Sequence, residues 1–149
     1  MAQTTRETVK LLCKSVVNRL ENQKAIQFPP RLRQVITDEI YNLIGPVILT
    51  EEDLRVRTLA MIGAKADALE GSEITESAQY KTAKSIVRKN FGDDELNGFY
   101  FQRTLKAVAH SIAEYMMRSS HIDDVFETDE DLERMVVEVV KHFKPENAH

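Results

Sequence analysis

The chain has 149 residues, of which 42% are hydrophobic, and its 20 basic and 24 acidic side chains give a formal net charge of −4. This length suits one domain with a core of ordinary size, so a single domain over residues 1–149 is predicted. The acidic total argues against a bulk affinity for nucleic acid, because phosphate binding needs a basic surface. Since no apolar run exceeds four residues, a membrane-spanning helix is excluded.

The first 22 residues carry several charged side chains and lack an apolar core, so we expect no signal peptide and a cytoplasmic location. The only cysteine, Cys13, lies in an amphipathic pattern, which predicts a buried thiol in a reducing compartment. All four histidines lie in the second half of the chain, and none has a meaningful spacing to Cys13. A Cys/His enzyme is therefore not predicted.

Apolar residues recur at steps of three and four along six segments, which predicts six amphipathic helices separated by glycine, proline and capping signals. A capping box of Thr4 with Glu7 opens the first of them. Val35 and Leu43 belong to the predicted buried stripe of the second. The expected ranges are 5–22, 30–44, 51–70, 73–91, 102–118 and 128–144.

The acidic cap Thr50-Glu51-Glu52-Asp53-Leu54 returns almost unchanged as Thr128-Asp129-Glu130-Asp131-Leu132. The helices upstream of the two caps also align, which predicts an internal duplication; convergent capping chemistry is the alternative explanation. The predicted fold is all-α: a six-helix bundle built from pseudo-repeated three-helix units at residues 5–70 and 73–144. The extended segments 25–28 and 98–101 hold equivalent places, so we expect them to pair as a small two-stranded ribbon.

Four segments of this pattern resemble the uncharacterised bacterial domain-of-unknown-function family DUF507. They are an apolar connector at Lys24-Ala25-Ile26-Gln27-Phe28, the acid-rich start at residues 50–54, an aromatic-basic helix at residues 79–89 and the segment Gly98-Phe99-Tyr100-Phe101. The resemblance covers about residues 4–101. It implies a small helical protein and brings no catalytic residues.

Two groups of residues are candidates for a metal site. His110 and Glu114 lie one helical turn apart and could bind zinc with His121, but a solvated ion pair between the first two is the favoured alternative. The acidic run from residue 123 to residue 133 lacks the glycine and the ligand order of a calcium-binding loop. Helix capping and solubility explain that run, and an acidic partner-binding patch is the alternative. We predict no metal and no cofactor.

Basic side chains recur along one face of the fourth predicted helix. The candidate partner-binding residues are Tyr80, Lys81, Lys84, Arg88, Arg103 and Lys106. Such a face could hold RNA phosphates or an acidic protein surface, and the alternative is an ordinary solvated helix face. The nucleic-acid interpretation becomes stronger if the face is exposed and continues to Arg103 and Lys106, and it becomes weaker if the acidic residues 93–95 divide the face.

No residues converge as acid, base and nucleophile, so the expected function is that of a non-enzymatic, cytoplasmic protein–protein interaction module. A nucleic-acid-associated accessory protein that uses the basic face is the alternative. The expected partner is another protein or a second copy of the chain, and no membrane. Self-association is expected if the apolar residues around the end of the second helix form an exposed patch; these residues are Tyr41, Leu43, Val47, Ile48 and Leu49.

Overall fold

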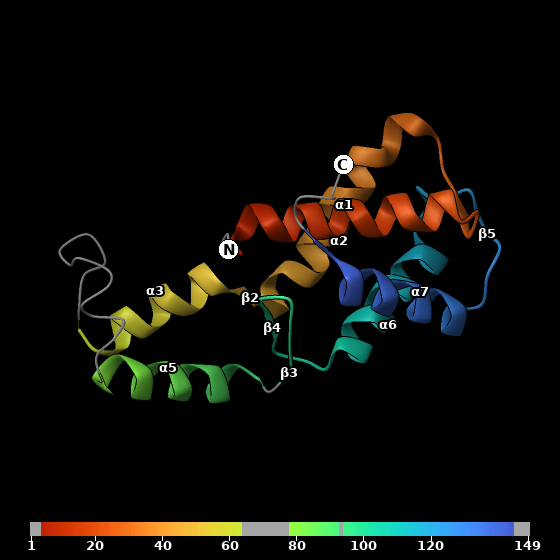
Figure 1. Ribbon diagram of the computed structural model, residues 1–149. Coiled ribbons are helices and arrows are strands. Elements are labelled where there is room, and N and C mark those ends of the chain that lie inside the picture. Colours follow the sequence, from red (N-terminus) through yellow and green to blue (C-terminus); the bar gives the residue numbers. More distant parts are fainter. Residues whose placement is uncertain (1–3, 64–77, 93, 145–149) are drawn as a thin grey trace.

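A computed structural model describes residues 4–63, 78–92 and 94–144. The described residues are mostly helical, which confirms the helical class, and two small antiparallel sheets join the helices (Figure 1). The helices are α1 (Arg6–Asn22), α2 (Arg33–Ile44), α3 (Glu51–Met61), α5 (Ala78–Phe91), α6 (Leu105–Arg118) and α7 (Asp129–His142), with short 3-10 turns η1 (Pro30–Leu32) and η2 (Gly45–Val47). The strands are β1 (Ile26–Gln27), β2 (Ile48–Thr50), β3 (Asp94–Leu96), β4 (Phe99–Phe101) and β5 (Asp124–Val125).

Four helices form the larger packed region. α1 packs against α2 and α7, and α6 packs against α7 and α2. Each helix turns an apolar stripe inward, because its apolar residues recur at the helical period. On α1 this stripe is fully buried and consists of Val9, Leu12, Cys13, Val16, Val17 and Leu20.

The other two helices, α3 and α5, form an arm that lies to one side of the four-helix region (Figure 1). They pack against each other, and the sheet with strand order β2-β4-β3 connects them to the rest of the chain. A smaller apolar cluster of Leu49, Leu54, Val87 and Tyr100 fills the space between these elements. The arm therefore has its own small core.

The predicted ribbon between residues 25–28 and 98–101 is wrong. β1 pairs with β5, with Ile26 opposite Val125. β4 pairs on one edge with β3 and on the other with β2. The reason is the turn at Asn97 and Gly98, whose positive φ angles of 55° and 84° suit a tight hairpin. The hairpin places β3 beside β4, β2 takes the second edge, and no edge of β4 is left for β1.

The capping box predicted at Thr4 and Glu7 is also wrong, because Thr5 precedes the first residue of α1. Thr4 instead forms hydrogen bonds to distant parts of the chain. Its hydroxyl donates to the Gly98 carbonyl over 2.7 Å and accepts from the Glu51 amide over 2.7 Å. Thr4 thus ties the start of the described chain to the β3–β4 turn and to the first residue of α3.

Arg6 joins the four-helix region to the arm. Its Nε donates to the Tyr41 hydroxyl over 3.1 Å, and its Nη2 donates to the Gly45 carbonyl over 3.0 Å. Its Nη1 donates both to the Ile48 carbonyl over 2.8 Å and to Asp53 Oδ2 over 3.1 Å. One guanidinium therefore holds α1, the end of α2, β2 and the start of α3 together.

The acidic cap of α3 forms as predicted. The Asp53 amide donates to Thr50 Oγ1, and the Thr50 amide donates to Asp53 Oδ2, each over 3.1 Å. Burial alone would raise the pKa of the Asp53 carboxyl, but hydrogen bonds from Thr50 and Arg6 and the Arg6 charge hold that pKa below its ordinary value. The corresponding cap of α7 is more exposed, with Thr128 Oγ1 accepting from the Asp131 amide over 3.1 Å.

Two residues of the predicted α2 stripe are not buried: Val35 is 40% exposed and Leu43 is 42% exposed. Ile36, Ile40 and Ile44 fill the space towards α1 and α6, so Val35 and Leu43 lie on the flank of a narrower stripe. Of the five residues proposed for a self-association patch, Leu43 alone is exposed, since Tyr41 and Val47 are half-buried and Ile48 and Leu49 are buried.

Other expected boundaries differ at helix ends. The second helix opens with the 3-10 turn η1, and the fifth begins at Leu105 behind the Thr104 cap. α3 ends at Met61, before the positive φ of Gly63, whereas the prediction extended to residue 70. The remaining expected helical positions, 64–77, lie outside the described residues. The internal duplication stays a prediction.

The Cys13 thiol should be unreactive in the folded protein. It is buried as predicted, and burial raises its pKa to about 12. Because the thiolate is the nucleophile, alkylation at neutral pH should be roughly a thousandfold slower in the native than in the denatured protein. A timed iodoacetamide reaction followed by mass spectrometry measures this ratio. Comparable rates in the two states would show that α1 opens readily.

Candidate functional site

The predicted basic face lies on α5, whose other side packs against α3. Tyr80 belongs to that packed side and is only 6% exposed, so it contributes to the core of the arm. Lys81 and Arg88 are exposed, and Lys84 is partly exposed. The basic residues therefore do share an outward surface, but the aromatic residue predicted beside them does not.

The C-terminal end of the basic face is partly neutralised. Arg88 Nη2 pairs with Glu95 Oε2 of β3 over 2.5 Å, and the Arg88 guanidinium lies 5.5 Å from the centre of the Tyr100 ring. Asp94 takes a different role, because its Oδ2 accepts from the Leu105 amide over 3.0 Å at the start of α6. Two acidic residues of β3 thus contact α5 and the start of α6. They divide the basic face, which weakens the nucleic-acid interpretation. Asp93 lies outside the described residues.

Arg103 and Lys106 line a separate feature, a groove of about 1010 Å³ between α6 and α7. Its floor includes the partly buried Leu105 and Val137. Charged side chains of both signs form most of the remaining lining, namely Arg103, Lys106, Arg134 and Lys141 with Asp129, Glu130, Glu133 and Glu138. The six predicted site residues are therefore distributed over a core position, the α5 face and this groove.

His110 lies in the α6–α7 groove and links the two helices. Its Nδ1 contacts Glu133 Oε1 of α7, and its Nε2 lies 3.2 Å from Glu114 Oε1 of α6, which confirms the ion pair expected at that spacing. The Glu133 hydrogen bond and the two neighbouring carboxylates raise the pKa of His110. His121 does not join this cluster, because it pairs with Glu39 of α2 over 3.1 Å. Among the described residues, no three His, Cys, Asp or Glu side chains are arranged so that they could hold a metal ion together.

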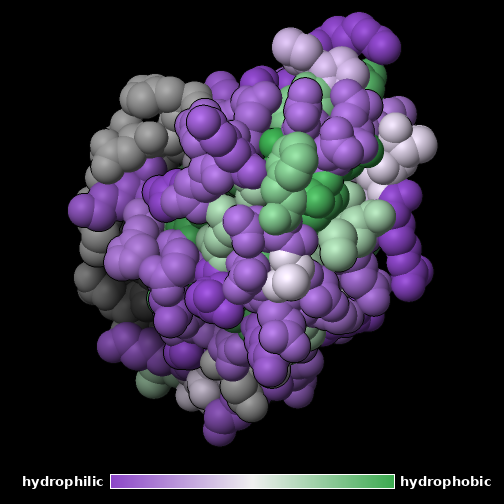
Figure 2. Space-filling view, turned by 90° about the vertical axis from the view of Figure 1, so that its right-hand side faces the viewer, coloured by the Kyte–Doolittle hydropathy of each residue, from purple (hydrophilic) through white to green (hydrophobic). Residues whose placement is uncertain are grey.

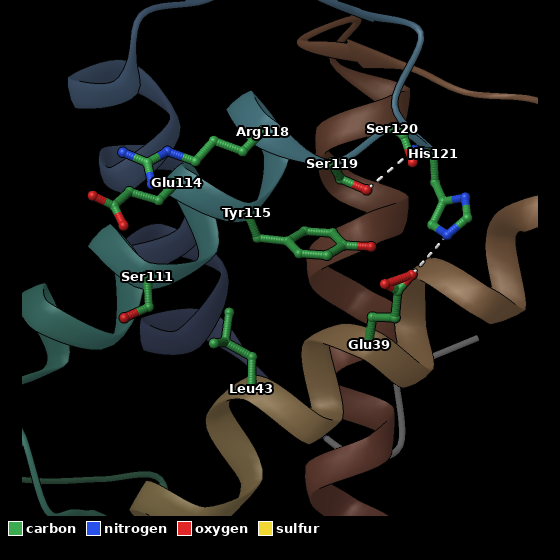
Figure 3. Close-up of a pocket in the computed structure, with 9 residues that line it drawn as sticks. All are labelled: Glu39, Leu43, Ser111, Glu114, Tyr115, Arg118, Ser119, Ser120 and His121. Carbon is green, nitrogen blue, oxygen red and sulfur yellow. Dashed lines mark hydrogen bonds and ion pairs between the residues drawn. The ribbon is translucent and has the colours of Figure 1, made fainter.

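A pocket of about 440 Å³ lies between α2, the C-terminal half of α6 and the loop that follows α6. The Tyr115 ring projects from α6 into the space between the two helices, and the His121 imidazole reaches down to Glu39 (Figure 3). Burial is the main reason that the pKa of Tyr115 is raised. Leu43 supplies an apolar wall. The remaining lining is mostly polar or charged, and the side chains drawn in Figure 3 do not form a triad of nucleophile, base and orienting acid.

Apolar side chains also gather on the face of the molecule that holds β5, where hydrophilic residues border them (Figure 2). Phe126, directly after β5, is 59% exposed, the largest exposed fraction among the large apolar side chains reported for the described residues. Isolated exposed apolar residues are common in proteins, so we assign this surface no role.

A protein-family model described as a protein of unknown function, DUF507, matches residues 3–148. The chain belongs to the DUF507 family. The predicted resemblance ended near residue 101, and the match shows that α6 and α7 belong to the family pattern as well. No curated protein and no solved structure matches the chain.

The described helices of this DUF507 protein include none with both the length and the apolar character needed to cross a lipid bilayer. Sequence reasoning missed the α2–α6 pocket, because Glu39, Tyr115 and His121 come from separate segments. It also missed Arg6, which looked like an ordinary charged residue of the first helical turn. A tyrosine inside an otherwise aliphatic stripe was the one local signal for the pocket.

Proposed function

We propose that this DUF507 protein is a non-enzymatic, cytoplasmic interaction module that binds an acidic protein surface through α5. The observation that supports this proposal is the composition of α5 together with its placement on the arm. Four basic side chains and no acidic one occur between residues 78 and 91; they are Lys81, Lys84, Arg88 and Lys89. The opposite side of α5 is occupied by packing against α3.

Exposed apolar side chains on the two helices of the arm favour a protein partner. Ile86 of α5 is 45% exposed, and on α3 Val56 and Met61 are 52% and 48% exposed. Protein interfaces combine apolar contacts with a charged rim, whereas a surface that follows a phosphate backbone needs a continuous series of cations. The pairing of Arg88 with Glu95 shortens that series.

The surroundings of the reactive side chains support a non-enzymatic role. His110 is held between two carboxylates, and His121 is paired with Glu39. Cys13 is fully buried. Each of these contacts has a plain structural purpose, so we assign none of the three residues a chemical step.

Reversal of two charges on α5 should abolish partner binding. In affinity purification after chemical cross-linking in the source cell, the Lys81→Glu/Lys84→Glu variant should recover at least about tenfold less partner than the unmodified protein, because like charges across an interface repel. The matched control is Lys14→Glu/Lys144→Glu, which reverses two exposed lysines elsewhere. Equal recovery by both variants would show that α5 is not the binding surface.

The same variants test the alternative function, a nucleic-acid-associated accessory protein. The α5 cations are the observation in its favour. Fluorescence anisotropy with a short single-stranded RNA, repeated over a range of salt concentrations, should show no salt-dependent binding if the partner is a protein. Tight binding that weakens steeply with salt and is lost in Lys81→Glu/Lys84→Glu would replace our proposal with the alternative.

A further inference from the structure

We propose that the α6–α7 groove is the interface of a homodimer, in which two copies of the chain meet in opposite directions across a twofold axis. This dimer goes beyond the proposed binding function of α5. It uses a different surface, since no residue of α5 is among those that line the groove.

The two ends of the groove carry opposite charge. α6 and α7 run antiparallel, so the start of α6 lies beside the end of α7 (Figure 1). Arg103, Lys106 and Lys141 therefore gather at one end, where Glu138 is the single acidic residue of the lining. At the other end the start of α7 contributes Asp129, Glu130 and Glu133, and the basic side chains of the lining beside them are Arg134 and His110.

A surface with this distribution is complementary to itself. A partner of one sign, such as a nucleic acid, would be attracted to one end of the groove and repelled from the other. A twofold axis across the middle of the groove instead places the basic end of each copy over the acidic end of the other. Every favourable contact then occurs twice, which is characteristic of isologous dimers.

Lys106 and Glu130 have the spacing and exposure that such contacts need. His110 of α6 contacts Glu133 of α7, so these two residues lie at the same level along the helix pair. Because the helices are antiparallel, Lys106, four residues before His110, lies nearly level with Val137, four residues after Glu133. Seven residues of α7 separate that level from Glu130, a distance of roughly 10 Å along the helix. Both charged side chains are exposed. The partly buried Leu105 and Val137 of the floor supply apolar contact between the charged ends.

The dimer would also change how the proposed α5 surface works. Two copies joined through the groove present two α5 faces to a partner. A partner with two acidic sites, or one that is itself oligomeric, would be bound bivalently and held more tightly than by one face. Loss of α5 binding leaves the dimer intact, and loss of the dimer leaves the α5 face intact, so the two proposals fail separately.

A charge-exchange experiment tests the dimer. Sedimentation equilibrium should show the full chain approaching twice its mass of 17.1 kDa as its concentration rises towards about 1 mM. Lys106→Glu and Glu130→Lys should each weaken self-association by about tenfold or more, because each variant places like charges opposite each other twice. An equimolar mixture of the two variants should recover the dimer, since both contacts then pair opposite charges.

Glu52→Lys is the matched control for Glu130→Lys, because each glutamate is the second residue of its helix and is exposed, but Glu52 lies outside the groove. Circular dichroism checks that all variants fold. A wild-type protein that stays monomeric overturns the proposal and leaves a charged segment of another protein as the occupant of the groove. A wild-type dimer that either variant leaves unchanged, or a mixture that does not recover it, also overturns the proposal, since another surface then joins the copies.

Discussion

Replacement of Arg6 by alanine should lower the free energy of unfolding by about 3 kcal/mol. The change removes a guanidinium that donates to two main-chain carbonyls, a tyrosine hydroxyl and a carboxylate at distances between 2.8 and 3.1 Å. Hydrogen bonds to charged groups contribute about 1.5–3 kcal/mol each, and partly buried acceptors without a donor add a desolvation cost. The Arg6 side chain is 36% exposed, and water can compensate for part of the loss, so we do not add these contributions in full.

Arg6→Lys should recover less than half of this loss. A lysine ammonium is a compact charge on a flexible stem and cannot reproduce the planar fork that reaches Gly45, Ile48 and Asp53 together. Urea unfolding followed by circular dichroism measures all the variants. Arg19→Ala, an exposed change near the other end of α1, is the control and should cost less than about 0.5 kcal/mol. If Arg6→Ala lowers the free energy of unfolding equally little, then the attachment of the arm to the four-helix region does not depend on Arg6.

The effect of Arg6 should depend on pH through Asp53. The pKa of Asp53 is lowered in the folded protein, so its contribution to stability is present above the ordinary aspartate pKa of about 3.9 and is lost as pH falls through the lower folded value. The difference in free energy of unfolding between the wild-type protein and Arg6→Ala should therefore be constant near neutral pH and become smaller in acid. If this difference stays constant as the pH falls, then Arg6 does not stabilise the fold through Asp53.

Gly92→Ala should destabilise the arm by about 3 kcal/mol. Gly92 directly follows the last residue of α5, and a Cβ atom there would lie 2.2 Å from the Phe101 carbonyl oxygen and 3.0 Å from the Gln102 Cα. These are main-chain atoms of β4 and of the residue that follows it, and they cannot rotate away as a side chain can. Relief requires α5 to move from the strand, and overpacking of this kind costs about 1–3 kcal/mol or more.

Gly63→Ala is the control for Gly92→Ala. It tests the cost of an unfavourable backbone conformation alone, whereas Gly92→Ala tests a steric clash. Gly63 has a φ of +76°, but a Cβ atom there would meet nothing within 4 Å. Its replacement should cost roughly 1–2 kcal/mol, the usual penalty for a left-handed non-glycine residue. Thermal unfolding of both variants gives the comparison. A smaller effect at Gly92 than at Gly63 would mean that β4 adjusts easily.

Local sequence signals predicted the helices and most of their ends, because caps and apolar periodicity act within a few residues. Thr50 caps α3 through the predicted residues, and Phe91 ends α5 as expected. The errors arise where a residue has a distant partner. Thr4 looks like a helix cap in the sequence, but its hydroxyl instead donates to the distant Gly98 carbonyl and accepts from the Glu51 amide. The strand partners could not be predicted either, because each small strand pairs according to which edges remain open.

The candidate site was predictable only in part, for a similar reason. The basic side of α5 follows from helical spacing, and that part of the prediction survives. Whether Arg103 and Lys106 extend it depends on how α5 and α6 are placed, which is a property of the whole fold. Val35 and Leu43 show the same limit, since periodicity identifies the apolar side of α2 but not how much of it neighbouring helices cover.

The packing of α1 against α7 bears on how the chain is made. During synthesis α1 leaves the ribosome before α7, so the contact between them cannot form until α7 has been translated. Until then the part of the apolar side of α1 that packs against α7 stays uncovered. A nascent chain in this state exposes side chains that favour aggregation, so a pause in translation before α7 would extend the period in which a chaperone is needed.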